Sequence, residues 1–222
     1  MTIRGMCATA GLAALLSACL GTPETRFYTL LRPSVEPDPA RAAPASAYAI
    51  EVLPVSVPAQ VDMPQFVLRQ GDGELALVES RQWAAPLAQE LRLGLSEHLA
   101  RELGVREVYR LGTGTGMPVR RIKVDVTRFD SVLGRHARLD AGWNVRDDAR
   151  GVSVTCSTQL QERVGESYED LVLGHQRALA RLAGEIALAV RALDGNGALD
   201  CPRLPVPGNP GDGSPPQPAS AR

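Results

Sequence analysis

The chain of 222 residues contains 24 lysines and arginines against 25 aspartates and glutamates, which gives a formal net charge of −1. Because binding to nucleic-acid phosphates needs a basic surplus or a basic stripe, this balance argues against a nucleic-acid-binding protein. Hydrophobic residues make up 44% of the chain, yet nothing after the N-terminal region approaches the roughly 20 apolar residues of a transmembrane helix. We therefore expect the rest of the chain to fold in water.

The N-terminal region has the pattern of a secretory signal peptide that ends in a cysteine. Arg4 precedes an apolar stretch at 6–16, which is too short to span a bilayer, and small residues at 17 and 18 stand before Cys19. In a bacterial lipobox the cysteine sulfur receives a diacylglycerol before cleavage makes that residue the new N-terminus. We predict a signal peptide at 1–18 and lipidation of Cys19. The alternative, an ordinary secretory signal with an incidental cysteine, predicts a soluble periplasmic protein.

The remaining cysteines predict a disulfide. Cys7 leaves with the signal peptide and Cys19 is acylated, so Cys156 and Cys201 are left as a pair in an oxidising compartment. A bridge between them would close a loop of about 45 residues and contribute on the order of 3 to 4 kcal/mol on the chain-entropy model. The alternative is a buried free thiol at Cys156, which is in phase with two apolar valines, with Cys201 unpaired in the tail.

Composition divides the mature chain into a tether, one domain and a tail. Residues 32–47 are rich in proline and alanine, and residues 201–222 are rich in proline and glycine. Neither segment has the apolar side chains to build a core. We predict an acylated N-terminus, a short strand and a linker at 19–47, a single domain at 48–200 and a disordered tail at 201–222. A segment of about 150 residues is an ordinary size for one domain.

Alternating apolar residues predict strands in two parts of the domain. The turn Gly71-Asp72-Gly73 indicates a hairpin in the first part. Turns at Gly134 and at 147–151 separate three alternating stretches in the second part, which predicts an antiparallel meander. The predicted strands cover residues 27–31, 48–55, 66–69, 74–78, 122–126, 139–145 and 152–156.

Two long amphipathic helices are also predicted. The first begins at Pro86, a favourable first-turn residue, presents leucines at four-residue steps over 87–103 and stops at Gly104. The second covers about 168–193 and has an apolar face of leucine, isoleucine and valine. These elements predict an α/β fold: a single domain with a mixed, largely antiparallel sheet packed by two long amphipathic helices. The side chains expected on the solvent side of the first helix are Glu90, Arg92, Glu97, His98 and Arg101.

No reactive constellation is visible in the sequence. The glycine-rich run at 112–116 is followed by Pro118 and another strand, so it lacks the strand-to-helix setting of a dinucleotide fingerprint. The histidines 98, 136 and 175 are far apart, with no cysteine or carboxylate at ligand spacing, so no metal is predicted. Hydrolase and zinc-protease motifs do not occur. We therefore expect a non-enzymatic protein without a cofactor. A serine or cysteine site assembled only by folding is the alternative.

A longer pattern resembles one known family. It consists of VSVPAQVDMPQFV at 55–67 and QWAAPL at 82–87, with FYTL at 27–30, VDVTRF at 124–129 and LDAGW at 139–143. These segments follow one another in the family's order across the whole domain. Together with the lipobox they resemble the PqiC/YmbA family, the auxiliary lipoproteins of ABC-type and MCE-domain transport systems.

The resemblance implies a lipoprotein at the periplasmic face of the outer membrane that docks onto an MCE-domain lipid transporter and has no catalytic centre. Leu20 and Gly21 agree with this location, because a signal for retention in the inner membrane would usually place aspartate after the cysteine. The resemblance also implies homo-oligomers that match a ring-shaped transporter. Two alternatives are a periplasmic carrier that binds phospholipid in an apolar groove and a structural envelope lipoprotein without a transporter partner.

Six residues are candidate contacts with the transporter. The segment 57–65 is either an exposed binding loop, in which two prolines limit the entropy lost on docking, or a rigid crossover that only shapes the fold. Trp83, close to Pro86, is either an interface anchor or a core aromatic at the helix start. The candidate residues are Val57, Pro58, Asp62, Pro64, Gln65 and Trp83.

Overall fold

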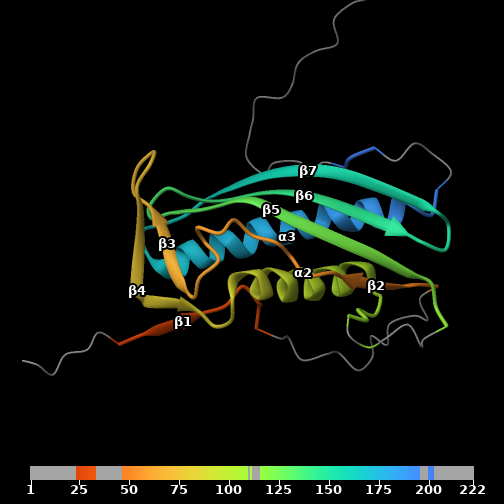
Figure 1. Ribbon diagram of the computed structural model, residues 1–222, viewed down its shortest axis with the longest axis horizontal. Helices are drawn as coiled ribbons and strands as arrows, with labels where there is room; N and C mark the ends of the chain where they lie inside the picture. Colours follow the sequence, from red (N-terminus) through yellow and green to blue (C-terminus); the bar gives the residue numbers. More distant parts are fainter. Residues whose placement is uncertain (1–23, 34–46, 110, 112–115, 196–199, 203–222) are drawn as a thin grey trace, which may run out of the picture.

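Two mixed β-sheets and two helices form the protein in a computed structural model that describes residues 24–33, 47–109, 111, 116–195 and 200–202 (Figure 1). The strands are β1 (Arg26–Tyr28), β2 (Ala49–Val52), β3 (Gln65–Arg69), β4 (Leu75–Trp83), β5 (Val119–Val132), β6 (His136–Asp147) and β7 (Val152–Arg163). The helices are α2 (Leu87–Leu103) and α3 (Tyr168–Ala192). The predicted lipidation site, Cys19, lies outside the described residues, as do the tail beyond residue 202 and most of the predicted linker.

The strands are divided between two sheets. A three-stranded sheet has the order β1-β4-β3, and a four-stranded sheet has the order β2-β5-β6-β7. In each sheet one outer strand is parallel to its neighbour, and the other pairings are antiparallel. The predicted hairpin and meander are confirmed, with longer strands in the meander than expected. The predicted single α/β domain with mixed strands and two long helices is also confirmed, although the strands form two sheets.

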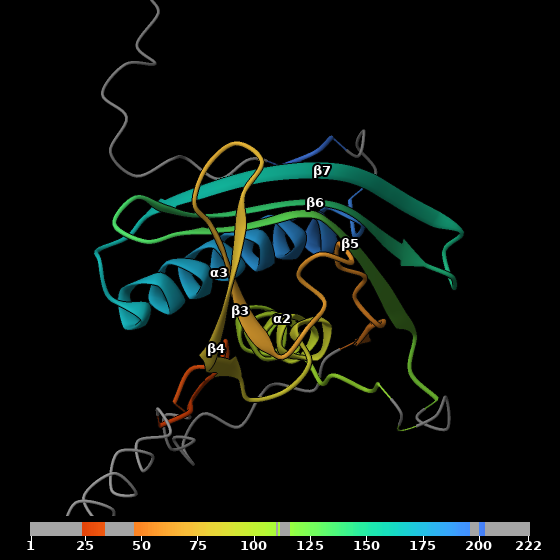
Figure 2. The same ribbon diagram turned by 60° about the vertical axis from the view of Figure 1, so that its left-hand side comes forward.

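The helices and the larger sheet are stacked in layers. One face of the four-stranded sheet is covered by α3, and α2 packs against α3 and against β2 at the edge of the same sheet (Figures 1 and 2). The three-stranded sheet stands across one end of this stack, so the β3–β4 hairpin crosses the direction of the long strands (Figure 2). The core lies between the larger sheet and the two helices, and the hairpin closes one end of it.

The leucine stripe of α2 is buried as predicted. A close approach to α3 at Gly94 makes this packing possible, because a Cβ atom at Gly94 would lie 2.5 Å from Cδ2 of Leu179. The helix ends at Gly104, whose φ of 65° lies in the left-handed region that glycine adopts without strain. The buried leucines of the stripe are Leu87, Leu91, Leu95 and Leu99.

Two residues predicted on the solvent side of α2, Glu90 and His98, are buried instead. The N-terminal segment covers that side of the helix. The Glu90 carboxylate accepts hydrogen bonds from Thr29 Oγ1 at 2.7 Å and from the Leu30 N–H at 2.8 Å. Leu30 itself is fully buried. Helical spacing could not predict the burial of these residues, because the segment that covers them lies 60 residues away in the sequence.

Buried polar contacts and a disulfide connect the meander to α3. The indole N–H of the buried Trp143 donates to Thr158 Oγ1 at 2.9 Å, and this hydroxyl donates to the Glu185 carboxylate at 2.5 Å. The structure also contains the predicted disulfide between Cys156 of β7 and Cys201, whose Cα atoms are 5.6 Å apart. The bridge ties the chain that follows α3 to the outer strand of the larger sheet.

Candidate docking surface

The segment 57–65 is a crossover between the two sheets. After β2 the chain follows β5 as far as Ser56, whose C=O accepts a hydrogen bond from the Val126 N–H at 2.9 Å. A tight turn comes next, in which the Val61 N–H donates to the Pro58 C=O at 3.0 Å. The chain then enters β3 in the smaller sheet. Both ends of the segment are therefore fixed by strands, and its turn projects between them.

The structure places the six candidate contact residues in this crossover and beneath it. Trp83 is buried, and its backbone N–H donates to the Pro64 C=O at 2.8 Å. Its ring centroid lies 4.3 Å from that of Phe66. Trp83 therefore supports the crossover from the core side. Of the other five, Asp62 and Pro64 are exposed, and Val57, Pro58 and Gln65 are partly buried.

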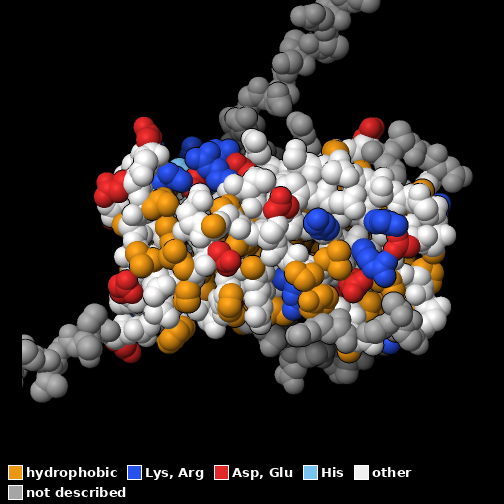
Figure 3. All heavy atoms as spheres, in the orientation of Figure 1, with side chains coloured by type: hydrophobic (Ala, Val, Ile, Leu, Met, Phe, Trp, Pro, Cys, Tyr) orange, Lys and Arg blue, Asp and Glu red, His pale blue; other side chains and the backbone are white. Residues whose placement is uncertain are grey.

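Beside the crossover, the β3–β4 hairpin exposes apolar side chains. Leu75 and Leu77 of β4 are 40% and 47% exposed. They share one face of the strand because side chains alternate along it, and Val67 of β3 is paired with Leu77. Hydrophobic side chains gather over this end of the molecule in the space-filling view (Figure 3). The turn of this hairpin was predicted, but its apolar exposed face was not.

Two adjoining hollows, each with about 210 Å³ of empty space that opens to solvent, lie among the hairpin, the crossover and the end of β5. Both are lined by Val61, Val67, Phe129 and Ser131. Most of this space is open solvent: each hollow has room for only about one water molecule, so it is far smaller than a small-molecule site and too shallow to enclose a whole side chain. We define the hairpin surface as Val61, Val67, Leu75, Leu77 and Phe129.

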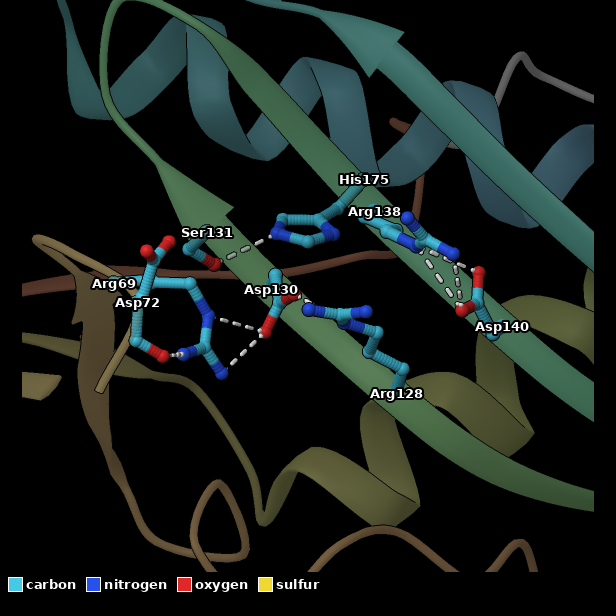
Figure 4. Close-up of polar contacts among 8 residues, drawn as sticks. All are labelled: Arg69, Asp72, Arg128, Asp130, Ser131, Arg138, Asp140 and His175. Carbon is cyan, nitrogen blue, oxygen red and sulfur yellow. Dashed lines mark hydrogen bonds and ion pairs between the residues drawn. The ribbon is translucent and has the colours of Figure 1, made fainter. Parts of the chain in front are cut away.

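An ion-pair network fixes the hairpin to the end of β5 (Figure 4). Arg69 of β3 contacts Oδ1 of Asp130 through Nε and Nη2, both at 3.0 Å, and Arg128 Nε lies 2.5 Å from Oδ2. Burial raises the pKa of the Asp130 carboxyl, but hydrogen bonds from Arg128 and Arg69 outweigh it and hold the pKa below its usual value. Asp130 is therefore ionised at neutral pH and positions Arg69 at the edge of the hairpin surface.

Folding also brings a serine and a histidine together behind this network. Ser131 Oγ lies 2.8 Å from Nε2 of His175 on α3, and the imidazole stacks on Phe129 with ring centroids 4.0 Å apart. Burial lowers the pKa of His175 to about 3, so the ring is neutral at pH 7. Its Nδ1 has no hydrogen-bond partner among the described residues, whereas the histidine of a serine-hydrolase triad is oriented by a third group. The pair connects β5 to α3 and lacks the arrangement of a triad.

Among the described residues, no group of three or more His, Cys, Asp or Glu side chains is arranged to hold a metal ion. Neither α2 nor α3 is long and apolar enough to cross a membrane. Within the described ranges, the hairpin surface with its exposed leucines is therefore the candidate functional site.

A family model names the class of protein to which this α/β fold belongs. The model, described as an ABC-type transport auxiliary lipoprotein component, matches residues 28–187. This range includes the crossover, the hairpin and the whole meander. The protein belongs to this family of ABC-type transport auxiliary lipoproteins, and the resemblance to the PqiC/YmbA family is confirmed.

Two solved structures have a similar fold. A crystal structure of an uncharacterized protein is 19% identical, with a TM-score of 0.61, and the alignment covers 76% of this chain and 99% of that one. The crystal structure of a Xanthomonas campestris protein of the DUF330 family is 18% identical, with a TM-score of 0.51, covering 73% and 92%. At these identities the similarity shows the fold alone. A search of curated proteins gave no match to this chain.

Sequence reasoning missed the leucines of the hairpin and the polar pairs behind them. The sequence does contain a pattern that could have predicted the exposed leucines. Leu75 and Leu77 are in phase with Glu79 in an alternating strand, and a strand that packs only one face on the core exposes the face that carries a charged residue. The Arg69–Asp130 pair has no such signal. Its partners are 61 residues apart, and only the crossing of the two sheets brings them together.

Proposed function

We propose that this protein is a lipid-anchored lipoprotein on the periplasmic face of the outer membrane, where it docks onto an MCE-type ABC lipid transport system without catalysing a reaction. The family match over residues 28–187 is the observation that supports this proposal most strongly. Lipidation at Cys19 would supply the anchor, and the residues after it, Leu20 and Gly21, favour the outer membrane. The MCE-domain subunit would be the partner, and assembly as a homo-oligomer would match a ring-shaped transporter.

The packing of the described residues favours docking over lipid carriage. A carrier would need an apolar groove between the leucine stripe of α2 and the sheet, but the four leucines of that stripe are at most 1% exposed and pack within the core. The two hollows at the hairpin are small and open. Because an acyl chain has to be enclosed along its length to leave water, these hollows are too small to hold one.

Native mass spectrometry of the acylated protein tests the proposal, after mild cross-linking in cells and gentle extraction from their membranes. We expect a complex that contains an MCE-domain subunit, with a fixed number of copies of this chain. Deletion of the gene for that subunit is the control and should remove the complex. A partner-free species with bound lipid would replace the proposal with a lipid carrier, and a partner-free species without lipid would indicate a structural lipoprotein.

A further inference from the structure

The hairpin surface is bordered by carboxylates that have no basic partner. Asp62 follows Val61 in the crossover, Asp72 and Glu74 lie at the tip of the hairpin, and Glu79 continues the row of Leu75 and Leu77 along β4. All four are exposed. Within the described ranges, none of them lies within ion-pair distance of a lysine, arginine or histidine.

Elsewhere in the fold, some surface carboxylates have a basic partner. Glu97 pairs with Arg101 on α2, and Glu102 pairs with Arg191 across the two helices. Arg69 lies at the edge of the hairpin surface, where it shares the Asp130 carboxylate with Arg128. The border of the hairpin surface therefore carries four carboxylates without an ion-pair partner in the described ranges, with Arg69 and Asp130 at one edge.

From this arrangement we propose that the hairpin surface is the docking site for a protein segment that packs an apolar side chain against Leu75 and Leu77 and presents lysine or arginine to the carboxylates beside them. The inference rests on the proposed function, because it assigns this segment to the transporter component. Exposed apolar side chains with a polar rim mark interaction sites in soluble proteins. The exposed faces of Leu75 and Leu77 would be buried against the apolar side chain, and the four carboxylates give the basic side chains complementary charge.

The acidic border also selects a protein partner over a membrane surface. Bacterial and other biological membranes expose anionic headgroups, which attract basic segments and repel acidic ones. A surface with four unpaired carboxylates would be held away from such headgroups even though leucines lie between them. The chain can therefore remain tethered by its acyl group while the hairpin surface faces away from the lipid.

Two variants separate the apolar and charged parts of the proposed site. The double change Leu75→Ser and Leu77→Ser removes the exposed apolar side chains and keeps all four carboxylates. The double change Glu74→Lys and Glu79→Lys reverses part of the border and keeps the leucines. The matched control is Leu173→Ser with Leu188→Ser on α3, since these leucines are 50% and 38% exposed and line neither hollow.

Designed peptides test the chemistry of the site without the transporter. The probes are an amphipathic leucine–lysine peptide of about 18 residues and a leucine–glutamate peptide of the same pattern. We expect the intact lipoprotein in detergent to bind the lysine peptide at least about tenfold more tightly than the glutamate peptide. The serine variant should lose at least about tenfold in affinity for the lysine peptide, the lysine variant should reverse the preference, and the α3 control should bind like the unchanged protein. Equal binding of both peptides, or unchanged binding by the serine variant, would overturn the proposal.

Photo-crosslinking in cells then identifies the natural occupant. Leu77→p-benzoylphenylalanine is compared with the same replacement at Leu188. We expect the probe at position 77 to crosslink a lysine- or arginine-rich segment of an MCE-domain subunit, and the probe at 188 not to. A crosslink at 77 to lipid or to a second copy of this chain would reject the docking assignment while the transporter could still co-purify. Loss of the transporter from the native complex would instead reject the proposed function, and the peptide result would still decide whether the hairpin surface recognises a basic apolar segment.

Discussion

The first residues of β5 lie in a closed network of ion pairs, whereas its last residues border a surface whose carboxylates have no basic partner. At the first end, Arg120 is 3% exposed, contacts Asp147 at 3.1 Å, donates to the Val190 C=O at 2.8 Å and pairs with Asp194. At the other end, Leu75 and its acidic neighbours face solvent. One strand therefore connects a buried network of ion pairs to an end where, beyond the pairs made by Asp130, four exposed carboxylates remain available to a partner.

The largest effect on stability is expected from a substitution in the buried ion-pair network at the first residues of β5. Replacing Arg120 with alanine leaves the Asp147 carboxylate, which is 3% exposed, without its partner, and removes a hydrogen bond to the last turn of α3. Breaking a buried ion pair in this way usually costs about 3 to 5 kcal/mol. We expect Arg120→Ala to lower the free energy of unfolding by that amount in urea titrations followed by circular dichroism.

Arg121 provides the control, because it pairs with Glu51 and Asp148 but its side chain is 38% exposed. Solvent screens such a pair, so Arg121→Ala should cost no more than about 1 kcal/mol. If both variants lost the same small amount of stability, the network around Arg120 would not be what holds this end of the sheet to α3.

Removing the disulfide tests the other covalent constraint on α3. The bridge from Cys156 to Cys201 closes a loop with a sequence separation of 45 residues. On the chain-entropy model, losing it should cost on the order of 3 to 4 kcal/mol. We expect Cys201→Ser to show this loss in urea unfolding under oxidising conditions and reductant to have no further effect on it. An unchanged midpoint would mean that the tail does not constrain the unfolded chain.

The pH dependence of stability tests whether His175, which is buried behind the hairpin, is neutral in the folded protein. Burial lowers the pKa of His175 from 6.5 in its ordinary environment to about 3. Between these values the unfolded chain binds a proton that the folded protein does not, so stability falls as the pH is lowered through this range. We expect a loss of about 2 kcal/mol between pH 7 and pH 5, measured as the free energy of unfolding.

The control for this series is His175→Gln, which keeps a hydrogen-bonding group near Ser131 but does not titrate. The pKa values of His98 and His136 are also lowered by burial, so their contributions have the same sign and cancel in the comparison of slopes. The depressed pKa of Asp130 removes stability only as the pH falls toward and below about 4, outside this range. A slope that His175→Gln leaves unchanged would show that His175 is hydrated or charged in the folded protein.

The sequence predicted those parts of the molecule whose signals are local. The spacing of leucines over 87–103 and the alternation in the meander identify α2 and the long strands, because both patterns repeat within a few residues. The burial of Glu90 and the contact between Arg69 and Asp130 depend on segments about 60 residues apart, and no local pattern encodes such meetings. The candidate site was predicted in part for the same reason: the crossover at 57–65 has a distinctive sequence, whereas its junction with the hairpin exists only after folding.

Substitutions at the hairpin surface should have the smallest effect on stability, in contrast to Arg120→Ala at the other end of β5. Leu77 is 47% exposed and Glu74 has no ion-pair partner in the described part of the chain, so neither side chain contributes much to folding. Exposed substitutions away from caps and buried networks usually change stability by at most about 0.5 kcal/mol. We expect Leu77→Ser and Glu74→Lys to stay within that limit in urea unfolding while they weaken binding of the basic peptide. A loss comparable to that of Arg120→Ala would mean that these side chains are needed for the fold, and the contrast between the two ends of β5 would then disappear.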